Sequence, residues 1–121
     1  YNANPMSMKA SLDVLHDGEG RRVAILGDMG ELGENEIALH EEVGTHAAQC
    51  GIDVCICVGA LSVHMAEAAR KADPEFKVIY EKSRESLLEH LGDLVQEGDT
   101  ILVKASHFMQ FEEVVKALEE M

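Results

Sequence analysis

The chain has 121 residues, of which 46% are hydrophobic, which is the size and apolar content of one ordinary domain with a core of its own. Its net charge of −13 repels nucleic acid and excludes a phosphate-binding stripe of Lys and Arg. No apolar run approaches the roughly 20 residues that cross a bilayer, and no basic, apolar leader precedes the first helix pattern, so we expect a cytoplasmic protein without a membrane span.

Short apolar runs alternate along the chain with longer segments of helical period. The pattern predicts, in chain order, a helix at 6–16, a strand at 22–27, a helix at 36–50, a strand at 54–59, a helix at 62–71, a strand at 77–80, a helix at 83–96, a strand at 100–103 and a helix at 110–120. Ser83 is placed to cap one of these helices and Gly51 to end another. Repeated strand–helix–strand units force parallel pairing with right-handed crossovers. We therefore predict an α/β domain with a Rossmann-like, doubly wound, three-layer fold: a mostly parallel sheet with helices on both faces.

A loop with three glycines and two carboxylates follows the first predicted strand, in the run AILGDMGELG at 24–33. The glycines are spaced three and three, which does not fit the Gly-x-Gly-x-x-Gly of dinucleotide-binding loops, and the chain has no Walker A motif. One interpretation is a tight turn in which Gly30 and Gly33 supply positive φ angles. The carboxylates of Asp28 and Glu31 favour a binding role, because ligands of such sheets sit beyond the carboxyl ends of the strands.

Lys104 follows the last predicted strand directly, and Ser106 and His107 come next, in the loop that leads to the final helix. A cation at the mouth of a buried strand requires an anionic neighbour, which is either a ligand or an ion pair with Asp28 or Glu31. Backbone amides at the start of the final helix also favour an anion. Because neighbouring parallel strands end at the same edge, we expect these two clusters to meet there.

The histidines and cysteines do not form the pattern of a metal site. His40 opens the stretch His-Glu-Glu-Val-Gly, in which Gly44 stands where a zinc helix carries its second ligand, and His46 falls on another helix face. A solvated or capping role for His40 is favoured over a place at the sheet edge. Cys55 and Cys57 lie two apart in a predicted strand and are expected to be buried, reduced thiols. We expect no metal site in this chain.

Three motifs, taken together, resemble the C-terminal domain of the Mur ligases: YNANPMSM at 1–8, LGDMGELG at 26–33 with His40 after it, and LVKAS at 102–106. The resemblance covers the whole chain and fits the branch of the family that adds D-alanyl-D-alanine. It implies that residues 1–121 form the third of three domains, with the N-terminal domain and the central ATPase domain absent. That would account for a chain that begins at Tyr1 without Met and lacks a Walker A motif.

The resemblance implies an ATP-dependent amide ligase of peptidoglycan synthesis. In such an enzyme ATP phosphorylates the carboxylate of UDP-N-acetylmuramoyl-tripeptide, and the amine of D-alanyl-D-alanine attacks the resulting acyl phosphate. Mg²⁺ and most phosphate contacts are implied for the central domain, on which this domain closes to exclude water. The domain alone is expected to carry no catalytic residue and to be inactive.

The resemblance also implies roles for the residues that match the family's motifs. These are, on the nucleotide side, Tyr1, Asn2 and Asn4; for the incoming amine, Asp28 and Glu31; and for the dipeptide carboxylate or the phosphoryl group, Lys104, Ser106 and His107. His107 departs from the family, whose members commonly carry Arg at this position. The shorter, only partly charged imidazole puts that anion contact in question.

Two other functions fit the sequence. One is a self-standing α/β module that binds a small acidic or zwitterionic ligand at the same edge. The other is the corresponding domain of a different Mur ligase, or of a folylpolyglutamate synthetase, with another amino-acid substrate. A Walker A motif roughly one domain length upstream would separate a ligase from a binding module. An assay of D-alanyl-D-alanine against single amino acids would separate the ligases.

Overall fold

A four-stranded, all-parallel sheet forms the centre of the molecule, in the order β3-β2-β1-β4. The computed structural model describes residues 3–121. Its strands are β1 (Arg22–Gly27), β2 (Val54–Val58), β3 (Lys77–Glu81) and β4 (Thr100–Lys104). The chain moves outward from β1 through β2 to β3 and returns to the other side of β1 for β4. The strand order therefore reverses between β1 and β4.

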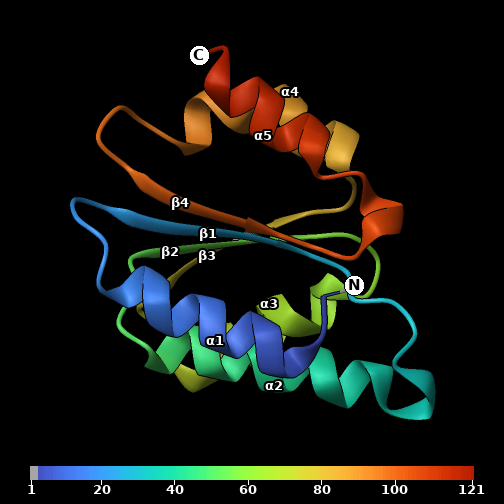
Figure 1. The fold of residues 1–121 in the computed structure, drawn as a ribbon. Coiled ribbons are helices and arrows are strands. Elements are labelled where there is room, and N and C mark those ends of the chain that lie inside the picture. The colour runs from blue at the N-terminus through green and yellow to red at the C-terminus, as the bar shows by residue number, and fades with distance from the viewer. Residues whose placement is uncertain (1–2) are drawn as a thin grey trace.

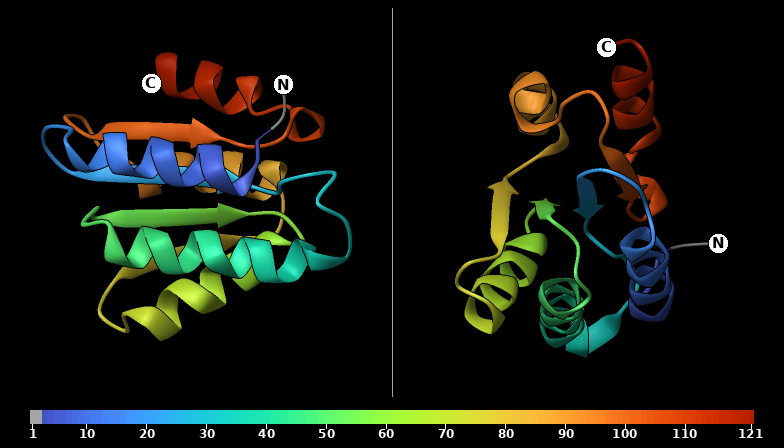
Figure 2. Two further views of the ribbon diagram at one scale, coloured as in Figure 1. Left: turned by 60° about the horizontal axis from the view of Figure 1, so that its bottom comes forward. Right: turned by 90° about the vertical axis from the view of Figure 1, so that its left-hand side faces the viewer.

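Helices cover both faces of the sheet (Figure 1). One face carries α1 (Pro5–His16), α2 (Glu36–Gln49) and α3 (Ser62–Ala72), and the other carries α4 (Arg84–Leu94) and α5 (Glu112–Glu119). Two short 3-10 turns, η1 (Gly33–Asn35) and η2 (His107–Met109), precede α2 and α5. Figure 2 shows the sheet between the two helix layers from further directions. The predicted three-layer, doubly wound α/β fold is confirmed.

Two apolar cores fill the space between the sheet and its helix layers. Side chains of β1 alternate between them: Ala24 and Leu26 belong to the core under α1, α2 and α3, whereas Val23 and Ile25 belong to the core under α4 and α5. β2 is buried along its whole length, as expected for a parallel strand that is covered on both faces. β4 lies at the sheet's edge and is only half-buried.

The helix ends follow local capping chemistry. Ser83 caps α4 as predicted, since its Oγ accepts a hydrogen bond from Ser86 N (3.1 Å). Gly51 follows α2 with a φ of +83°, the conformation that commonly ends a helix. At α1, Asn4 Oδ1 accepts from Ser7 N (2.9 Å) and Ser7 Oγ accepts from Asn4 N (3.2 Å). This capping box fixes the direction in which the chain enters α1.

Gly44 lies where α2 packs against α3. A Cβ at this position would come within 2.1 Å of the backbone oxygen of Met65. The glycine that occupies the place of a zinc ligand is therefore required for helix packing.

Cys55 and Cys57 are fully buried free thiols of β2, with their Sγ atoms 3.7 Å apart. The contact with Cys55, followed by burial, raises the pKa of Cys57. The prediction of buried, reduced thiols is confirmed.

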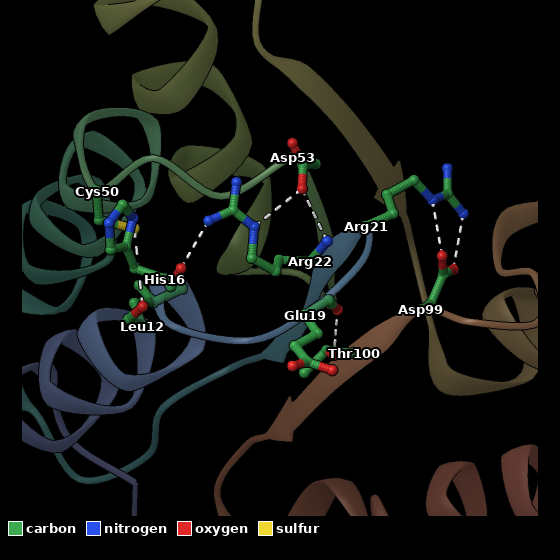
Figure 3. Close-up of polar contacts among 9 residues, drawn as sticks. All are labelled: Leu12, His16, Glu19, Arg21, Arg22, Cys50, Asp53, Asp99 and Thr100. Atoms are coloured by element: carbon green, nitrogen blue, oxygen red, sulfur yellow. Dashed lines mark hydrogen bonds and ion pairs between the residues drawn. The ribbon is translucent and has the colours of Figure 1, made fainter.

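Two ion pairs lie at the amino ends of the strands, which form the amino edge of the sheet (Figure 3). Arg21 donates to Asp99 twice, from Nε to Oδ1 (3.0 Å) and from Nη2 to Oδ2 (2.9 Å). Arg22 reaches Asp53 Oδ2 from its backbone N (2.8 Å) and from Nε (3.1 Å). The hydrogen bond from Arg21 lowers the pKa of Asp99, and the amide and then the guanidinium of Arg22 lower the pKa of Asp53. These four charges satisfy one another within the fold.

Candidate functional site

The carboxyl ends of β1 and β4 lie side by side, at the point where the strand order reverses. Their pairing sets Leu26 opposite Lys104, so the loops that follow start at the same level. Ser106 joins the loops, because its backbone N donates to Asp28 O (3.1 Å) and its Oγ accepts from Gly30 N (2.7 Å). The predicted meeting of the Asp28 loop with the Lys104 cluster is confirmed. Open α/β sheets bind their ligands at such a place.

Asp28 is 6% exposed, and its carboxylate binds the start of α3. Oδ1 accepts from Ser62 N (2.8 Å) and Ser62 Oγ (2.7 Å), and Oδ2 accepts from Leu61 N (3.2 Å). Gly59, at a φ of +118°, passes so close that a Cβ there would lie 2.5 Å from Oδ1. Asp28 thus links β1 to the loop after β2, a contact that the sequence did not reveal. Its Oδ2 accepts one bond and keeps capacity for another.

The turn after Asp28 uses different left-handed residues from those predicted. Gly33 has a positive φ (+75°) as expected, but Gly30 does not, and Glu31 does (+61°). A Cβ at Gly30 would lie 3.0 Å from the Phe108 ring, which would have to shift slightly to make room for it. A left-handed residue with a side chain costs of order 1–3 kcal/mol, and such residues cluster at functional sites. The exposed Glu31 is therefore kept as a candidate for ligand binding.

His40 holds the same loop from α2. Its ring is fully buried, Nε2 accepts from Met29 N (3.0 Å), and Nδ1 lies 2.7 Å from Glu36 O. Because a carbonyl oxygen can only accept, Nδ1 carries the proton and the ring is neutral. The expectation of a solvated or capping histidine is wrong. The contact arises from the packing of α2 beneath the loop, which the local sequence does not show.

Lys104, Ser106 and His107 line a hollow of about 310 Å³ at the outer edge of β4, between α1 and α5. Ala3 and Ser11 lie on its α1 side, and Lys104 Nζ donates to Ser11 Oγ (3.1 Å). Ser106 is buried, Lys104 is half-buried and His107 is exposed. The described chain therefore starts beside this cluster, close to the carboxyl ends of the strands (Figure 1).

Of the residues predicted on the nucleotide side, Tyr1 and Asn2 lie outside the described residues. Asn4 is exposed at the start of α1, and its Oδ1 is occupied as the helix cap by the bond from Ser7 N. The side-chain NH₂ group of Asn4 is the donor left for a ligand.

The described residues hold no cluster suited to a metal. Within 3–121, no three His, Cys, Asp or Glu side chains are grouped so that they could hold an ion. His46 pairs with Asp13 of α1 (2.7 Å) and does not converge on His40. The helices of the described residues are also too short or too polar to cross a bilayer.

A second hollow, of about 350 Å³, lies at the carboxyl ends of β1, β2 and β3. η2 separates it from the first: His107 lines the hollow of Lys104, and Phe108 lines the second. Lys82 and Arg84 also line the second hollow. Lys82 lies in the loop after the predicted strand 77–80, one of the strand ends at which ligands of such a sheet are expected. Arg84 falls within the predicted helix 83–96 and belongs to no motif, so the sequence did not single it out.

Known proteins are similar in sequence to this chain. The family described as "Mur ligase, glutamate ligase domain" matches residues 1–107. The UDP-N-acetylmuramoyl-tripeptide–D-alanyl-D-alanine ligase of Bacillus subtilis is 38% identical and that of Escherichia coli is 40% identical, each over 99% of this chain. The chain covers 27% and 26% of these proteins, so it spans about a quarter of the length of the curated relatives that it matches.

Solved structures share the fold. A crystal structure of MurF from Acinetobacter baumannii superposes with a TM-score of 0.88 at 30% identity, covering 100% of this chain and 27% of that one. MurF ligase from Thermotoga maritima, in complex with ADP, superposes with a TM-score of 0.78 at 28% identity, covering 99% of this chain and 26% of that one.

Proposed function

The chain belongs to the Mur ligase family, as its motifs predicted, and we propose that it is the C-terminal closing domain of a cytoplasmic, ATP-dependent amide ligase. The proposed ligase adds D-alanyl-D-alanine to UDP-N-acetylmuramoyl-tripeptide in peptidoglycan synthesis. The observation that carries the proposal is the match of 99% of the chain to two ligases of that name, at 38% and 40% identity. Because the chain spans about a quarter of their length, an N-terminal domain and a central ATPase domain would lie outside it.

In the proposed reaction, the tripeptide carboxylate is activated as an acyl phosphate at the expense of the cosubstrate ATP, and the dipeptide amine then displaces phosphate to form the amide. We assign the ATP phosphates and Mg²⁺ to the central domain. This assignment is supported by the missing Walker A motif and by the lack of a metal cluster within residues 3–121. A nucleotide site in the whole protein is supported by the ADP complex of the Thermotoga maritima neighbour.

The part proposed for this chain is to orient the acceptor and to exclude water by closing on the central domain. Asp28 and Glu31 would orient the incoming amine, which is a cation before it loses its proton. Lys104, Ser106 and His107 would face the dipeptide carboxylate or the phosphoryl group. The proposal is supported by the Ser106 bonds to the Asp28 loop, which keep both groups at one edge.

Tyr1, Asn2 and Asn4 are proposed to contact the nucleotide. Support comes from Ala3, which lies between them in sequence and lines the same hollow as Lys104. A nucleotide held by this segment would therefore lie on the Lys104 side of η2.

The proposal is tested with the full-length protein that contains this chain. Purified protein is supplied with ATP, the UDP-linked tripeptide and either D-alanyl-D-alanine or single amino acids, and the amide product is measured by mass spectrometry. We expect product with the dipeptide only. A preference for a single amino acid, or no product with any acceptor, would contradict the proposal.

A second assay uses residues 1–121 alone. With the nucleotide phosphates assigned elsewhere, this piece should release no ADP from ATP. Steady ADP release by the pure piece would contradict the assignment of the ATPase function to another domain.

A further inference from the structure

The hollow on the far side of η2 from Lys104 is lined by charges of both signs, which come from the ends of β1 and β3 and from the start of α4, where Glu85 also lines it. Asp28 follows β1, Lys82 follows β3, and Arg84 begins α4, while Gly59 and Ala60 at the end of β2 add backbone to the lining. Its volume of about 350 Å³ falls within the roughly 300–1,000 Å³ of small-molecule sites.

The anionic group of the hollow is held in a fixed position. Asp28 is 6% exposed, and its three hydrogen bonds come from Leu61 N, Ser62 N and Ser62 Oγ. All three donors are uncharged groups, so no cation neutralises the carboxylate through these bonds. With one bond on Oδ2, the carboxylate can accept another from a ligand ammonium.

The cationic groups differ in how firmly they are held. Lys82 is exposed, and within the described chain its ammonium makes no ion pair or hydrogen bond. Arg84 is anchored, because Nη1 donates to Gln110 Oε1 (3.0 Å) and Nη2 to Glu85 Oε2 (2.8 Å). Its Nε is buried and has no partner. Although the chain carries 23 acidic residues against ten basic ones, Lys82 pairs with none of those in the described part, and its ammonium is available to an anion from outside.

We propose that this hollow binds a small zwitterion, with the ligand's ammonium at Asp28 and its carboxylate at Lys82 and Arg84. The identity of the ligand rests on the proposed function: it is the incoming D-alanyl-D-alanine. Two extended residues span at most about 7 Å, which a hollow of this volume can enclose. The Phe108 ring, 62% exposed, offers apolar surface for the two methyl groups.

By this proposal the two hollows bind different groups of the reactants. The carboxylate of the acceptor would lie at Lys82 and Arg84, on one side of η2. Lys104, on the other side and beside Ala3, would then face the phosphoryl group. Lys82 and Arg84 are thus residues that select an acceptor with a free carboxylate.

The test compares D-alanyl-D-alanine with its C-terminal amide, which lacks the negative charge, as acceptors for the full-length protein. The variant is Lys82→Ala, and the matched control is Lys77→Ala, an exposed lysine at the opposite end of β3. Wild type should prefer the acid in kcat/KM. Lys82→Ala should raise KM for the acid about tenfold, the size of one charge-assisted hydrogen bond, and leave KM for the amide nearly unchanged. Lys77→Ala should keep the wild-type preference.

Two further variants keep the proposal falsifiable. Lys82→Arg should restore the preference for the acid, and Arg84→Lys, which keeps the charge but loses the planar fork, should weaken it. An unchanged preference in both Lys82→Ala and Arg84→Lys would overturn the proposed subsite. If wild type formed no product that depends on the dipeptide, the proposed function would fall instead.

Discussion

The two edges of the sheet use charge in opposite ways. At the amino edge, Arg21 and Arg22 each bind a carboxylate and a backbone carbonyl, Leu94 O (3.0 Å) and His16 O (2.6 Å) respectively. At the carboxyl edge, Asp28 is bonded to amides and a hydroxyl. The difference separates charges that the fold itself neutralises from charges that can be offered to a ligand.

Substitutions should therefore affect different quantities at the two edges. A broken pair at the amino edge leaves a charge without its partner, which lowers the free energy of unfolding. At the carboxyl edge, removal of a half-buried group such as Lys104 should change the free energy of unfolding little, because its proposed interaction is with a substrate. The following predictions test this separation, beginning with the largest expected effect.

Lys104→Ala in the full-length protein should slow amide formation about 100-fold, the usual effect of removing one group that stabilises developing charge. Because Lys104 is half-buried and its bond to Ser11 lies at the edge of the sheet, the midpoint of thermal unfolding should hardly change. Product formation is followed by mass spectrometry and unfolding by calorimetry. Unchanged turnover would remove Lys104 from the site.

Asp99→Ala should lower the free energy of unfolding and leave the rate of amide formation unchanged. Its side chain is 1% exposed and accepts two hydrogen bonds from Arg21, so the variant should lose about 2–3 kcal/mol in the free energy of unfolding, below the range for fully buried pairs. Turnover measured below the unfolding transition should stay at the wild-type value. Denaturant titration gives the first quantity, and a large loss of turnover in folded protein would break the proposed separation.

His40→Gln should affect both quantities, because this buried residue supports the carboxyl-edge loop. The loss of the bond to Met29 N or to Glu36 O should cost about 1–2 kcal/mol in unfolding free energy. The loop that carries Asp28 and Glu31 should loosen, so kcat should fall more than the thermal midpoint suggests. His46→Gln, a half-buried histidine of α2 that pairs with Asp13 of α1, is the control, and equal behaviour of the two variants would argue against a positioning role.

The pH dependence of stability should come partly from the amino edge. The pKa of Asp53 and that of Asp99 are lowered from 3.8 in the folded state, so their contributions are complete above that value and are lost as the pH falls below it. The double variant Asp53→Asn, Asp99→Asn should have a lower free energy of unfolding at pH 5. As the pH falls by roughly two units from there, it should lose less of that free energy than the wild type does. An equal fall in the free energy of unfolding with falling pH for wild type and variant would contradict this assignment.

The order of elements was predictable because local patterns determine it. Each strand is an apolar run next to a turn residue or a charge, as with β1 between Arg22 and Asp28, and all four strands lie within one residue of the predicted bounds. Parallel topology placed Asp28 and Ser106 at the same end of the sheet, and their close contact needs in addition that β1 and β4 are neighbours, which the structure shows. These features need no knowledge of side-chain packing.

The remaining features of the site depend on packing between distant segments. His40 reaches Met29 only because α2 lies beneath the loop, and Asp28 meets Ser62 only because β2 is the neighbour of β1. Glu31 is left-handed, and the neighbouring Gly30 lies beside the Phe108 ring, which comes from the loop after β4. No local motif encodes contacts of this kind.

Hydrogen exchange of the full-length protein compares the two edges in one measurement. Amide exchange is followed with and without the UDP-linked tripeptide, D-alanyl-D-alanine and a non-hydrolysable ATP analogue. If the carboxyl edge is the binding edge, amides in residues 28–33 and 104–110 should exchange more slowly with ligands, while those in 17–22 and 95–100 keep their rates. Protection confined to the amino edge would place the ligands at the opposite end of the sheet and contradict the account.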